Sequence, residues 1–476
     1  MRLLALVGLP ALAGLLTYVL PSASLRTLAL LVAAAVHLAI VGSAWYAEPA
    51  PALSGWIAAD ALGLLILTVV TILFAAVATY TVGYLRLERP RGGRAFVSCL
   101  LGFLAATSLV SVSHHLALLW VGMEATTLAV APLIFHRHDR RSLEAVWKYL
   151  VLSSVGIALA LFGVFLLATA QPLGAGRPLV LEDLVAHAGD LEPSWLRAAF
   201  VFLLVGFGTK MGLAPLHAWK PDTYGEAPGL VGGLMAGALT SCAFLGVARV
   251  AQIAVAAGLF SFLQPLLFAF GGLSLVVAAA FIVGQNDVKR LLAYSSVEHM
   301  GLLVLGLALG GGGAYGTALH LVNNALAKGV LFLAVGNVVL VTGTPLVGGE
   351  AHGMLRRSPV SGMLTLVGLL AVTGSPPFGM FVSEFIIIRA AVTEGHLWAA
   401  ALIVTFLAVI FIGIARVILQ LCFGAPQVDE QARESPWLVV GPCVLAGVVL
   451  LLGLYIPVPL HEALGRAAAS LGGHSP

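Results

Sequence analysis

Four ionisable residues interrupt apolar stretches of this chain: Glu124, Lys210, Lys328 and Glu384. A charged side chain at the centre of a bilayer costs roughly 2.5–3.5 kcal/mol, so it is rarely kept there without a partner or a path for water. Carboxylates and lysines that face one another hold or release protons as they couple and uncouple. The sequence therefore predicts that these four residues are proton-transfer sites near the middle of a membrane.

Glu124 and Lys210 are predicted to form the first pair. Glu124 lies about nine residues after the predicted start of its helix, and at a rise of 1.5 Å per residue this is near mid-membrane. A carboxylate that faces a lysine keeps its charge, whereas a lone one is protonated by desolvation. A static buried ion pair is the alternative, but such pairs contribute little to stability. We therefore favour a proton switch.

Other polar residues flank these four and are candidates for a secondary relay. His320, Asn324 and Lys328 are spaced by four, so they lie along one helix face. For His320, a packed histidine bonded to a neighbouring helix is an equal alternative. Lys220 and Asp222, taken one by one, are better explained by a solvated loop at the cytoplasmic end. The full set of secondary candidates is His217, Lys220, Asp222, Glu226, Glu298, His299 and His320.

Glycine and proline break two of the helices that must position these residues. The first break contains Gly212 and Pro215, and the second contains Pro376 and Pro377. Proline removes a backbone donor and clashes with the preceding turn, so each helix is predicted to be interrupted there. Breaks at corresponding places in two halves are typical of transporters with inverted repeats. Looser helix packing is the alternative, but each broken span also carries an ionisable residue, which favours function.

The composition is that of a polytopic membrane protein. Of 476 residues, 60% are hydrophobic and 9% are charged, and the mean hydropathy is +1.04, which is far outside the range of soluble domains. Windows of about twenty apolar residues, enough to cross a bilayer of roughly 30 Å, predict an all-α fold with about fourteen transmembrane helices in a single membrane domain. The predicted spans are 3–20, 26–46, 57–85, 95–112, 115–136, 145–170, 198–219, 229–254, 259–285, 290–310, 313–343, 360–392, 396–423 and 436–456.

Positively charged residues gather in the loops on one side of this topology. The positive-inside rule makes that side cytoplasmic, so both termini are predicted to lie outside the cytoplasm. The residues that set this orientation are Arg86, Arg89, Arg91, Arg94, Arg137, Arg140, Arg141, Lys289, Arg290, Arg356 and Arg357.

Several classes of partner and cofactor are not indicated. A formal charge of +3 spread over loops gives no basic surface for nucleic acid. The four cysteines have no paired spacing for a disulfide or a metal, and no nucleotide-binding loop, haem motif or Walker motif is present. We therefore expect no cofactor and no metal site. His114 and His115 are expected at an outer helix end, in an interfacial position.

Five segments between roughly residues 95 and 390 match a known pattern: WVGMEATTLAVAPL, GFGTKMGLAPLHAWKPDTYGEAP, KRLLAYSSVEHMG, HLVNNALAKGVLFLAVGN and SPPFGMFVSEF. With them the chain resembles the antiporter-like proton-translocating subunits of respiratory complex I, of multisubunit Mrp-type Na+/H+ antiporters and of membrane-bound hydrogenases. EATTL, AVWKYLVLSSVGIALAL and SSVEHMG bring it nearest to the hydrogenase-4 component F type.

The resemblance implies fourteen helices with two inverted five-helix repeats, in which helices 7 and 12 are broken. It divides the single domain into 1–94 (helices 1–3), 95–254 (first repeat), 259–423 (second repeat) and 436–476 (helix 14 and a short tail). It also implies that Glu124 and Lys210 form the first half-channel pair, that Lys328 is the connecting site and that Glu384 is the terminal site. The eighth span departs from the family, because it has no lysine or histidine where many relatives have one.

Three hypotheses follow. The first is a proton-translocating subunit of a redox-driven or ion-coupled complex, itself without a redox centre, in a bacterial or archaeal cytoplasmic membrane. Its partners would be the lipid bilayer and other membrane subunits of a complex I-like, hydrogenase-like or Mrp-like assembly. The second is a Na+/H+ antiporter subunit or a proton-coupled carrier of another ion. The third is a structural anchor for a peripheral enzyme, with vestigial charges.

Overall fold

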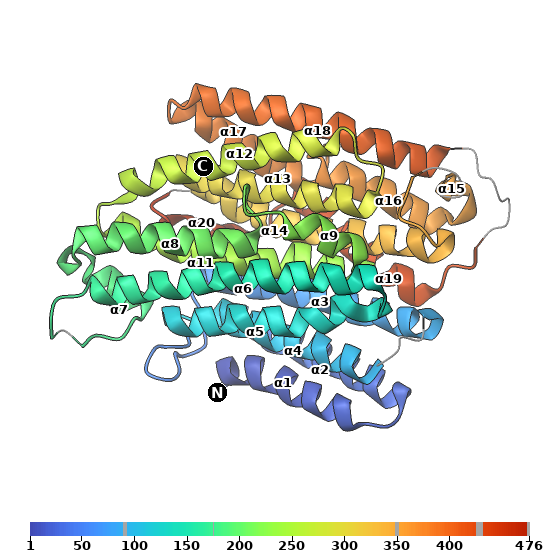
Figure 1. Cartoon of the computed structure of the whole chain (residues 1–476), viewed down its shortest axis with the longest axis horizontal. Helices are drawn as coiled ribbons and strands as arrows, with labels where there is room; N and C mark the ends of the chain where they lie inside the picture. The colour runs from blue at the N-terminus through green and yellow to red at the C-terminus, as the bar shows by residue number, and fades with distance from the viewer. Residues whose placement is uncertain (89–92, 175, 348–351, 425–431, 474–476) are drawn as a thin grey trace.

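The computed structural model describes residues 1–88, 93–174, 176–347, 352–424 and 432–473, which are almost entirely helical (Figure 1). Among these residues, extended segments pair only as isolated β-bridges, and no strand is formed. The elements are α1 (Arg2–Val19), α2 (Ala23–Tyr46), α3 (Ala61–Glu88), α4 (Gly93–Val112), α5 (Leu116–Ile134), η1 (Phe135–Arg137), α6 (Arg140–Thr169), α7 (Leu181–Ala186), η2 (Ala188–Asp190), α8 (Pro193–Met211), α9 (Trp219–Glu226), α10 (Gly229–Leu234), η3 (Met235–Leu239), α11 (Thr240–Ala256), α12 (Phe260–Ile282), α13 (Val288–Leu309), α14 (Gly311–Thr342), α15 (Met354–Arg357), α16 (Pro359–Val372), α17 (Gly379–Thr393), α18 (Leu397–Phe423), α19 (Pro436–Leu454) and α20 (Val458–Ser470).

The described part of the chain contains 13 helices that are long and apolar enough to cross a membrane. The predicted twelfth span is instead divided into α16 and α17, and counting that pair as one broken span restores the fourteen predicted spans. Helix ends differ by a few residues from the prediction. α6 begins at Arg140 rather than at residue 145, because Asp139 caps it through a reciprocal pair of hydrogen bonds with Ser142.

Both predicted helix breaks are present. α8 ends at Met211 and is capped by Gly212, whose φ of +77° lies in the left-handed region, and the chain then turns before α9. α16 ends at Val372 and is followed by Gly374, with φ +63°, before α17 starts at Gly379. Glycine adopts such φ values without the steric cost that a Cβ would bring, which is why each helix can stop abruptly inside the molecule.

The two breaks occupy matching places in the order of the spans. Within the predicted first repeat, the broken span α8–α9 is the fourth of five, and within the predicted second repeat the broken span α16–α17 is also the fourth of five. This correspondence is the one that a pair of inverted repeats requires. It confirms the antiporter-like architecture that the sequence predicted.

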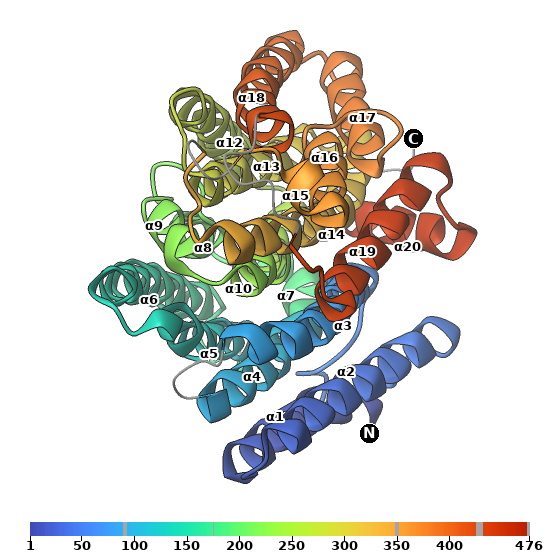
Figure 2. The same cartoon turned by 90° about the vertical axis from the view of Figure 1, so that its right-hand side faces the viewer.

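α14 runs through the centre of the molecule. Viewed along the helices, it lies between a group formed by α4, α5, α6 and α8 and a group formed by α12, α16, α17 and α18 (Figure 2). It packs against α13, α16, α17 and α19, and nearly all of its side chains are buried. The short helix α9 packs against α6 of the first group and against α13, which packs against α12 of the second group.

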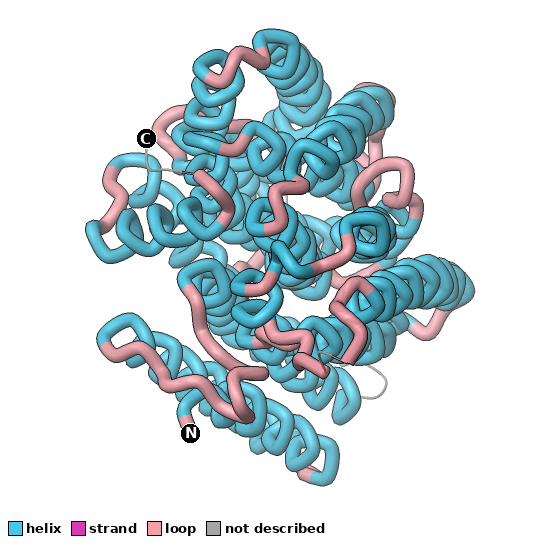
Figure 3. The backbone as a smooth tube through the Cα atoms, turned by 90° about the vertical axis from the view of Figure 1, so that its left-hand side faces the viewer, coloured by secondary structure: helices cyan, strands magenta, loops and turns pink. Residues whose placement is uncertain are grey.

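The N-terminus lies toward the end of the molecule that carries α7, on the left in Figure 1 and facing the viewer in Figure 3. Gly473, the last described residue, pairs with Gly311 at the start of α14. α15, with Arg356 and Arg357, lies at the end opposite to α7. The side of the membrane that each end faces stays a prediction.

Two elements were not predicted. The eighth span is continuous from Gly229 to Ala256 but contains the π-helical turn η3 in its middle. The segment after the fourteenth span, expected to be a short tail, forms the helix α20, which packs against α3 and α14.

Candidate functional site

Lys210 and Glu124 are connected through a hydroxyl group rather than paired directly. The Lys210 ammonium, fully buried on the last turn of α8, donates to the Thr127 hydroxyl of α5 (2.6 Å) and to the Tyr149 hydroxyl of α6 (3.0 Å). The Thr127 hydroxyl in turn donates to Glu124 Oε2 (3.1 Å). We call Glu124, Thr127, Tyr149 and Lys210 the Lys210 cluster. Its four side chains come from three helices and reach from the half-buried Glu124 into the interior.

Lys220 is buried, so the expectation of a solvated loop at this residue was wrong. Its ammonium donates to the Ser296 hydroxyl of α13 (3.0 Å), and its carbon chain lies against Gly212, where a Cβ would overlap it. The turn at Gly212 therefore directs α9 inward and positions this lysine. Asp222, also on α9, is partly exposed and pairs with Lys148 and Arg290 (2.7 and 2.8 Å).

Lys328 lies at the junction between α13 and α14. Its buried ammonium donates to the Ser295 hydroxyl (2.7 Å), which donates to Glu298 Oε2 (3.3 Å). We call Ser295, Glu298 and Lys328 the Lys328 cluster. Ser295 and Ser296 are neighbours on α13, so the hydroxyls that accept hydrogen bonds from Lys328 and Lys220 lie next to each other.

His299, His320 and Glu384 form a further buried group, which we call the Glu384 cluster. One ligand-capable atom of each lies within 4.8 Å of the others, and the three residues come from α13, α14 and α17. His299 Nε2 is also 4.0 Å from Glu298 Oε2, which joins this cluster to the Lys328 cluster. The second helix break makes room for Glu384, because a Cβ at Gly374 would overlap its carboxylate.

A polar cavity of about 630 Å³ opens beside α9 on the side of the arginine-rich loops. Asp222 and Glu226, two of the predicted secondary residues, line it together with Arg141, Lys148 and Arg290. His217 does not line this cavity; it is half-buried in the turn before α9, and its ring lies 6.4 Å from that of Tyr294. Lys220, although it is also on α9, does not line this cavity.

The serine and threonine hydroxyls that connect the charges were missed by the sequence reasoning. Thr127 is three residues after Glu124, and Ser295 is three residues before Glu298, so each hydroxyl lies on the same helix face as the carboxylate it contacts. This spacing is the signal that would have found them. Tyr149 carries no such signal, because its contact with Lys210 depends on how α6 packs against α8.

The expected interfacial position of His114 was also wrong. His114 is buried between Asp60 and Glu182, and the Asp60 carboxylate is held by both guanidinium nitrogens of the buried Arg249 at 2.7 Å. Burial alone would lower the pKa of His114, but its hydrogen bonds to Asp60 and Glu182 outweigh this and raise it. Burial disfavours the Asp60 carboxylate, yet Arg249 holds its pKa well below the usual range. We call Asp60, His114, Glu182 and Arg249 the Arg249 cluster.

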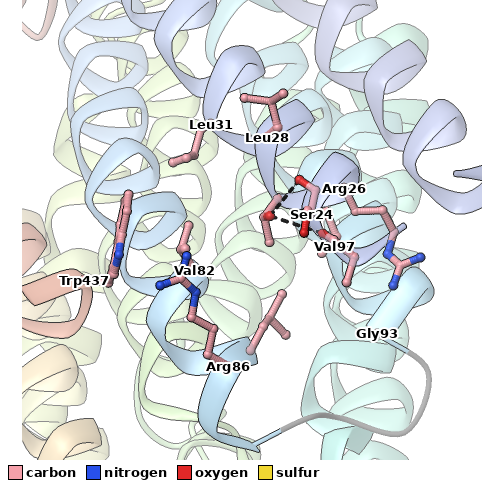
Figure 4. A pocket seen from close by; sticks show the side chains of 12 residues that line it. Ser24, Arg26, Leu28, Leu31, Val82, Arg86, Gly93, Val97 and Trp437 are labelled. Carbon is pink, nitrogen blue, oxygen red and sulfur yellow. Dashed lines mark hydrogen bonds between the residues drawn. The ribbon is translucent and has the colours of Figure 1, made fainter. Parts of the chain in front are cut away.

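A second cavity, of about 660 Å³, lies between α2, α3, α4 and α19. Figure 4 shows Arg26 and Arg86 at its rim, with Arg86 beside the ring of Trp437 (5.6 Å) and Leu28 and Leu31 on its wall. None of the predicted proton-transfer residues lines it. The buried charges therefore form a site of their own, enclosed by helix packing.

Similarity to known proteins covers most of the chain. Residues 113–411 match the family described as NADH:quinone oxidoreductase/Mrp antiporter, transmembrane. A hydrogenase-4 component F homolog of Methylacidiphilum infernorum is 34% identical over 377 residues, which is 78% of each chain. The NADH-quinone oxidoreductase subunit N of Alkalilimnicola ehrlichii is 29% identical over 91% of this chain and 88% of its own length.

Solved structures show the same fold over nearly the full length. A chain of the membrane-bound sulfane sulfur reductase, an archaeal respiratory membrane complex, superposes with a TM-score of 0.90 at 25% identity and covers 99% of this chain and 98% of its own. A chain of respiratory complex I from Thermus thermophilus gives 0.85 at 25% identity, with 99% and 100% covered. The protein is thus an integral membrane subunit, and it belongs to the NADH:quinone oxidoreductase/Mrp antiporter family of antiporter-like membrane proteins.

Proposed function

We propose that this chain moves protons along the row formed by the Lys210 cluster, Lys220, the Lys328 cluster and the Glu384 cluster. The observation that carries the proposal is that seven acidic, lysine and histidine side chains of this row are buried in a membrane protein, and that each of its three lysines donates to a hydroxyl group. Charges are costly in such surroundings, and the combination of acids, lysines and histidines is that of proton relays.

Hydroxyl groups suit the links of such a row. A hydroxyl donates one hydrogen bond while it accepts another, so Thr127 and Ser295 each contact a lysine and a carboxylate at once. When the lysine gives up a proton, another reaches it from the carboxylate through the hydroxyl, and the helices do not have to move.

The step between Lys210 and Lys220 is among those that have no such link. Between Lys210 and Lys220 lie the turn at Gly212 and the rings of Trp219 and Tyr149, whose centroids are 5.3 Å apart. A proton crosses this step through water or through movement of the Lys220 side chain. Such a step is a suitable point of control, because protons cross it only when the turn at Gly212 and the Lys220 side chain are suitably placed.

Protons enter in this proposal from the cavity beside α9, near Glu226 and Lys220, and leave through Glu384. The arginine-rich end that carries this cavity is assigned to the cytoplasm by the positive-inside rule, in the cytoplasmic membrane of a bacterium or archaeon. Both termini then lie on the outer side.

Partner subunits would supply the energy. The relatives are named as subunits of NADH-quinone oxidoreductase, F420H2 dehydrogenase and hydrogenase-4, and the row of this chain contains groups that transfer protons rather than electrons. We propose that redox events elsewhere in a complex change the coupling between the clusters.

Protons fit the row better than Na+ does. Along most of its length the deepest groups are lysines and histidines, and a lysine ammonium offers donors and no acceptor to a metal cation. A Na+ path would require continuous oxygen ligands. A Na+/H+ antiporter subunit therefore remains the competing hypothesis, to be separated by experiment.

The test uses the purified complex that contains this chain, reconstituted into vesicles with a pH-sensitive dye. Lys210→Met removes the ammonium at nearly constant volume, and we expect proton movement to fall by about a hundredfold or more, as for loss of a proton-transfer group. Arg197→Met is the matched control. Arg197 is an exposed cation on the first turn of the same helix, and its loss is expected to leave transport unchanged.

Two outcomes would contradict the proposal. Undiminished proton movement in a Lys210→Met complex that assembles normally would favour the structural-anchor hypothesis. Transport that stops when Na+ is replaced by K+ would favour the Na+-coupled one.

A further inference from the structure

The Glu384 cluster has an arrangement that a proton relay alone does not require. His299 and His320 are fully buried and Glu384 is 7% exposed, and one nitrogen or oxygen atom from each lies within 4.8 Å of the other two. Three side chains from three helices thus point at one small volume. The sequence predicted no metal site, because the cysteines have no paired spacing and no cofactor motif is present.

All three residues of this cluster have polar atoms that lack partners. Both ring nitrogens of His299, Nε2 of His320 and Oε1 of Glu384 have no hydrogen bond among the described residues. Buried polar side-chain atoms are usually paired, and an exception calls for an explanation such as an ion or water. Unpartnered atoms on all three residues of one cluster point to an occupant.

His320 is held in an orientation that suits a metal ligand. Its Nδ1 is 3.0 Å from the Ser383 hydroxyl, which leaves Nε2 directed at the cluster. Metal-bound histidines usually have their second nitrogen fixed in this way by a neighbouring group. Ser383 immediately precedes Glu384 on α17, so one helix turn supplies the carboxylate ligand and also the hydroxyl that orients His320.

The donor set selects the class of ion. Two imidazole nitrogens and one carboxylate oxygen are the ligands of many zinc sites, with a fourth position open, whereas Na+ and Mg2+ favour oxygen ligands. Zinc with bonds of about 2.0–2.2 Å brings its ligand atoms to about 3.5 Å from one another. The cluster must therefore close by only about 1 Å, a small side-chain adjustment.

The charges nearby are compatible with a dication. Glu384 is a ligand, and Glu298, whose Oε2 is 4.0 Å from His299 Nε2, adds a second carboxylate. Together they neutralise a divalent ion. The Lys328 ammonium opposes it, and its hydrogen bond to Ser295 holds it beside Glu298.

We propose that His299, His320 and Glu384 bind a divalent transition-metal ion such as Zn2+, and that the bound ion closes the Glu384 end of the row. The binding rests on the ligand geometry alone. The closure rests on the proposed function, because a bound ion occupies the one basic lone pair of each neutral histidine and holds the carboxylate in its charged form, so these groups no longer pass protons on.

Binding is tested on the purified complex after metal removal by a chelator. Co2+ is the probe, since it occupies zinc sites and gains a strong visible absorption when four-coordinate. We expect one equivalent per chain to bind with this absorption and to be displaced by Zn2+. His320→Gln and Glu384→Gln should each weaken Co2+ binding by at least about tenfold, as loss of even a supporting group does at such sites.

Two further variants keep the test specific. Ser383→Ala removes the hydrogen bond that orients His320 but leaves all three ligands, so weaker binding with the absorption retained is expected. His37→Gln is the matched control, a buried histidine whose nitrogens are bonded to Ser108 (2.9 Å) and Thr71 (3.0 Å) and so are not free for a metal. Its Co2+ binding should equal that of the unaltered chain.

The site is wrong if Co2+ binds without the four-coordinate absorption, or if the His320 and Glu384 variants keep it. The closure is tested separately, by adding Zn2+ to the reconstituted complex during proton movement. Metal binding without any slowing would overturn the closure and leave the site standing. Because Co2+ binding is measured without transport, its failure is distinct from failure of the Lys210→Met test.

Discussion

The Lys210 cluster and the Glu384 cluster are built in opposite ways. In the first, the lysine donates to two hydroxyls and the carboxylate accepts from one of them, so its groups are held in a fixed network. In the second, both nitrogens of His299 and one oxygen of Glu384 have no partner among the described residues. The nearby Asn324 amide is also unpartnered.

The difference indicates distinct tasks at the two ends of the row. A fixed network keeps a proton on Lys210 until a neighbour moves, whereas unpaired buried groups need water, a proton or an ion to be satisfied. The Glu384 end should therefore respond to what enters it, and the Lys210 end to how α5, α6 and α8 pack. The four predictions below test this contrast, in order of decreasing effect.

Lys328 lies between the two ends, so its removal should uncouple them. For Lys328→Met we expect proton movement to fall by about a hundredfold, because the row loses a transfer group. Dye-monitored transport in vesicles measures this. Tyr315→Phe on the same helix is the control, since its hydroxyl contacts His461 (2.6 Å), outside the row. A Lys328→Met complex that transports at half the normal rate would show that the ends work independently.

The hydroxyl groups of Thr127 and Ser295, which each connect a lysine to a glutamate, should differ in how readily water replaces them. Thr127→Val keeps the side-chain shape and removes the bridge between Lys210 and Glu124, and we expect about a tenfold loss of rate, equivalent to a strong hydrogen bond. Ser295→Ala should cost only about two- to threefold, because its hydrogen bond to Glu298 is longer (3.3 Å) and water can take the place of its hydroxyl. Equal losses in the two variants, measured in the same vesicle assay, would show that the two hydroxyl bridges are equally replaceable.

The first helix break can be tested with two glycines of similar backbone conformation. Gly212 and Gly395 have φ values of +77° and +80°, and alanine at either should cost about 1–2 kcal/mol. Only at Gly212 would the new Cβ also displace Lys220. Gly212→Ala should therefore slow transport severalfold, and Gly395→Ala should lower the thermal unfolding midpoint alone. Identical transport rates in the two variants would mean that the position of Lys220 does not matter.

The Arg249 cluster should affect stability and leave transport unchanged. The pKa of His114 is raised above 6.5, so its contribution is present below about pH 6.5 and is lost as the pH rises through the folded-state pKa. The pKa of Asp60 is held below 3.8, so its contribution is present above that value and is lost in acid. Stability from this cluster should therefore be greatest between about pH 4 and 6.5.

His114→Gln should abolish the loss of stability that occurs as the pH rises above about 6.5. The free energy of unfolding involved should be less than about 1 kcal/mol, because Glu182 is partly exposed. Thermal unfolding of the complex at several pH values measures it. A variant that unfolds with an unchanged slope above pH 6.5 would show that His114 is not the titrating group.

Hydropathy and proline positions were sufficient to predict the spans and both breaks. Each span needs about twenty apolar residues whatever its neighbours, and Pro215 and Pro377 interrupt a helix through their own covalent structure. The cost of burying charge likewise predicted Lys210 and Lys328 as buried sites, because that cost depends on local surroundings alone.

The remaining features depend on how helices pack, which local sequence does not specify. Lys220 follows a turn and is succeeded by the polar segment PDTYGE, so its burial against α13 could not be inferred without the position of α9. The Glu384 cluster combines residues 21 and 64 positions apart, and no periodicity links them. The roles of the individual residues stay predictions until the variants are measured.

The π-helical turn η3 stores one extra residue in the eighth span. A π turn arises where a residue is inserted into an α-helix, so it can revert to regular α geometry when one residue is removed. Gly237 lies within it, and a Cβ there would meet the carbonyl of Ala325 on α14. Deletion of a single residue in 235–239 should thus leave Arg249 and the rest of α11 in register. A deletion elsewhere in the same helix would turn every following side chain by about 100°.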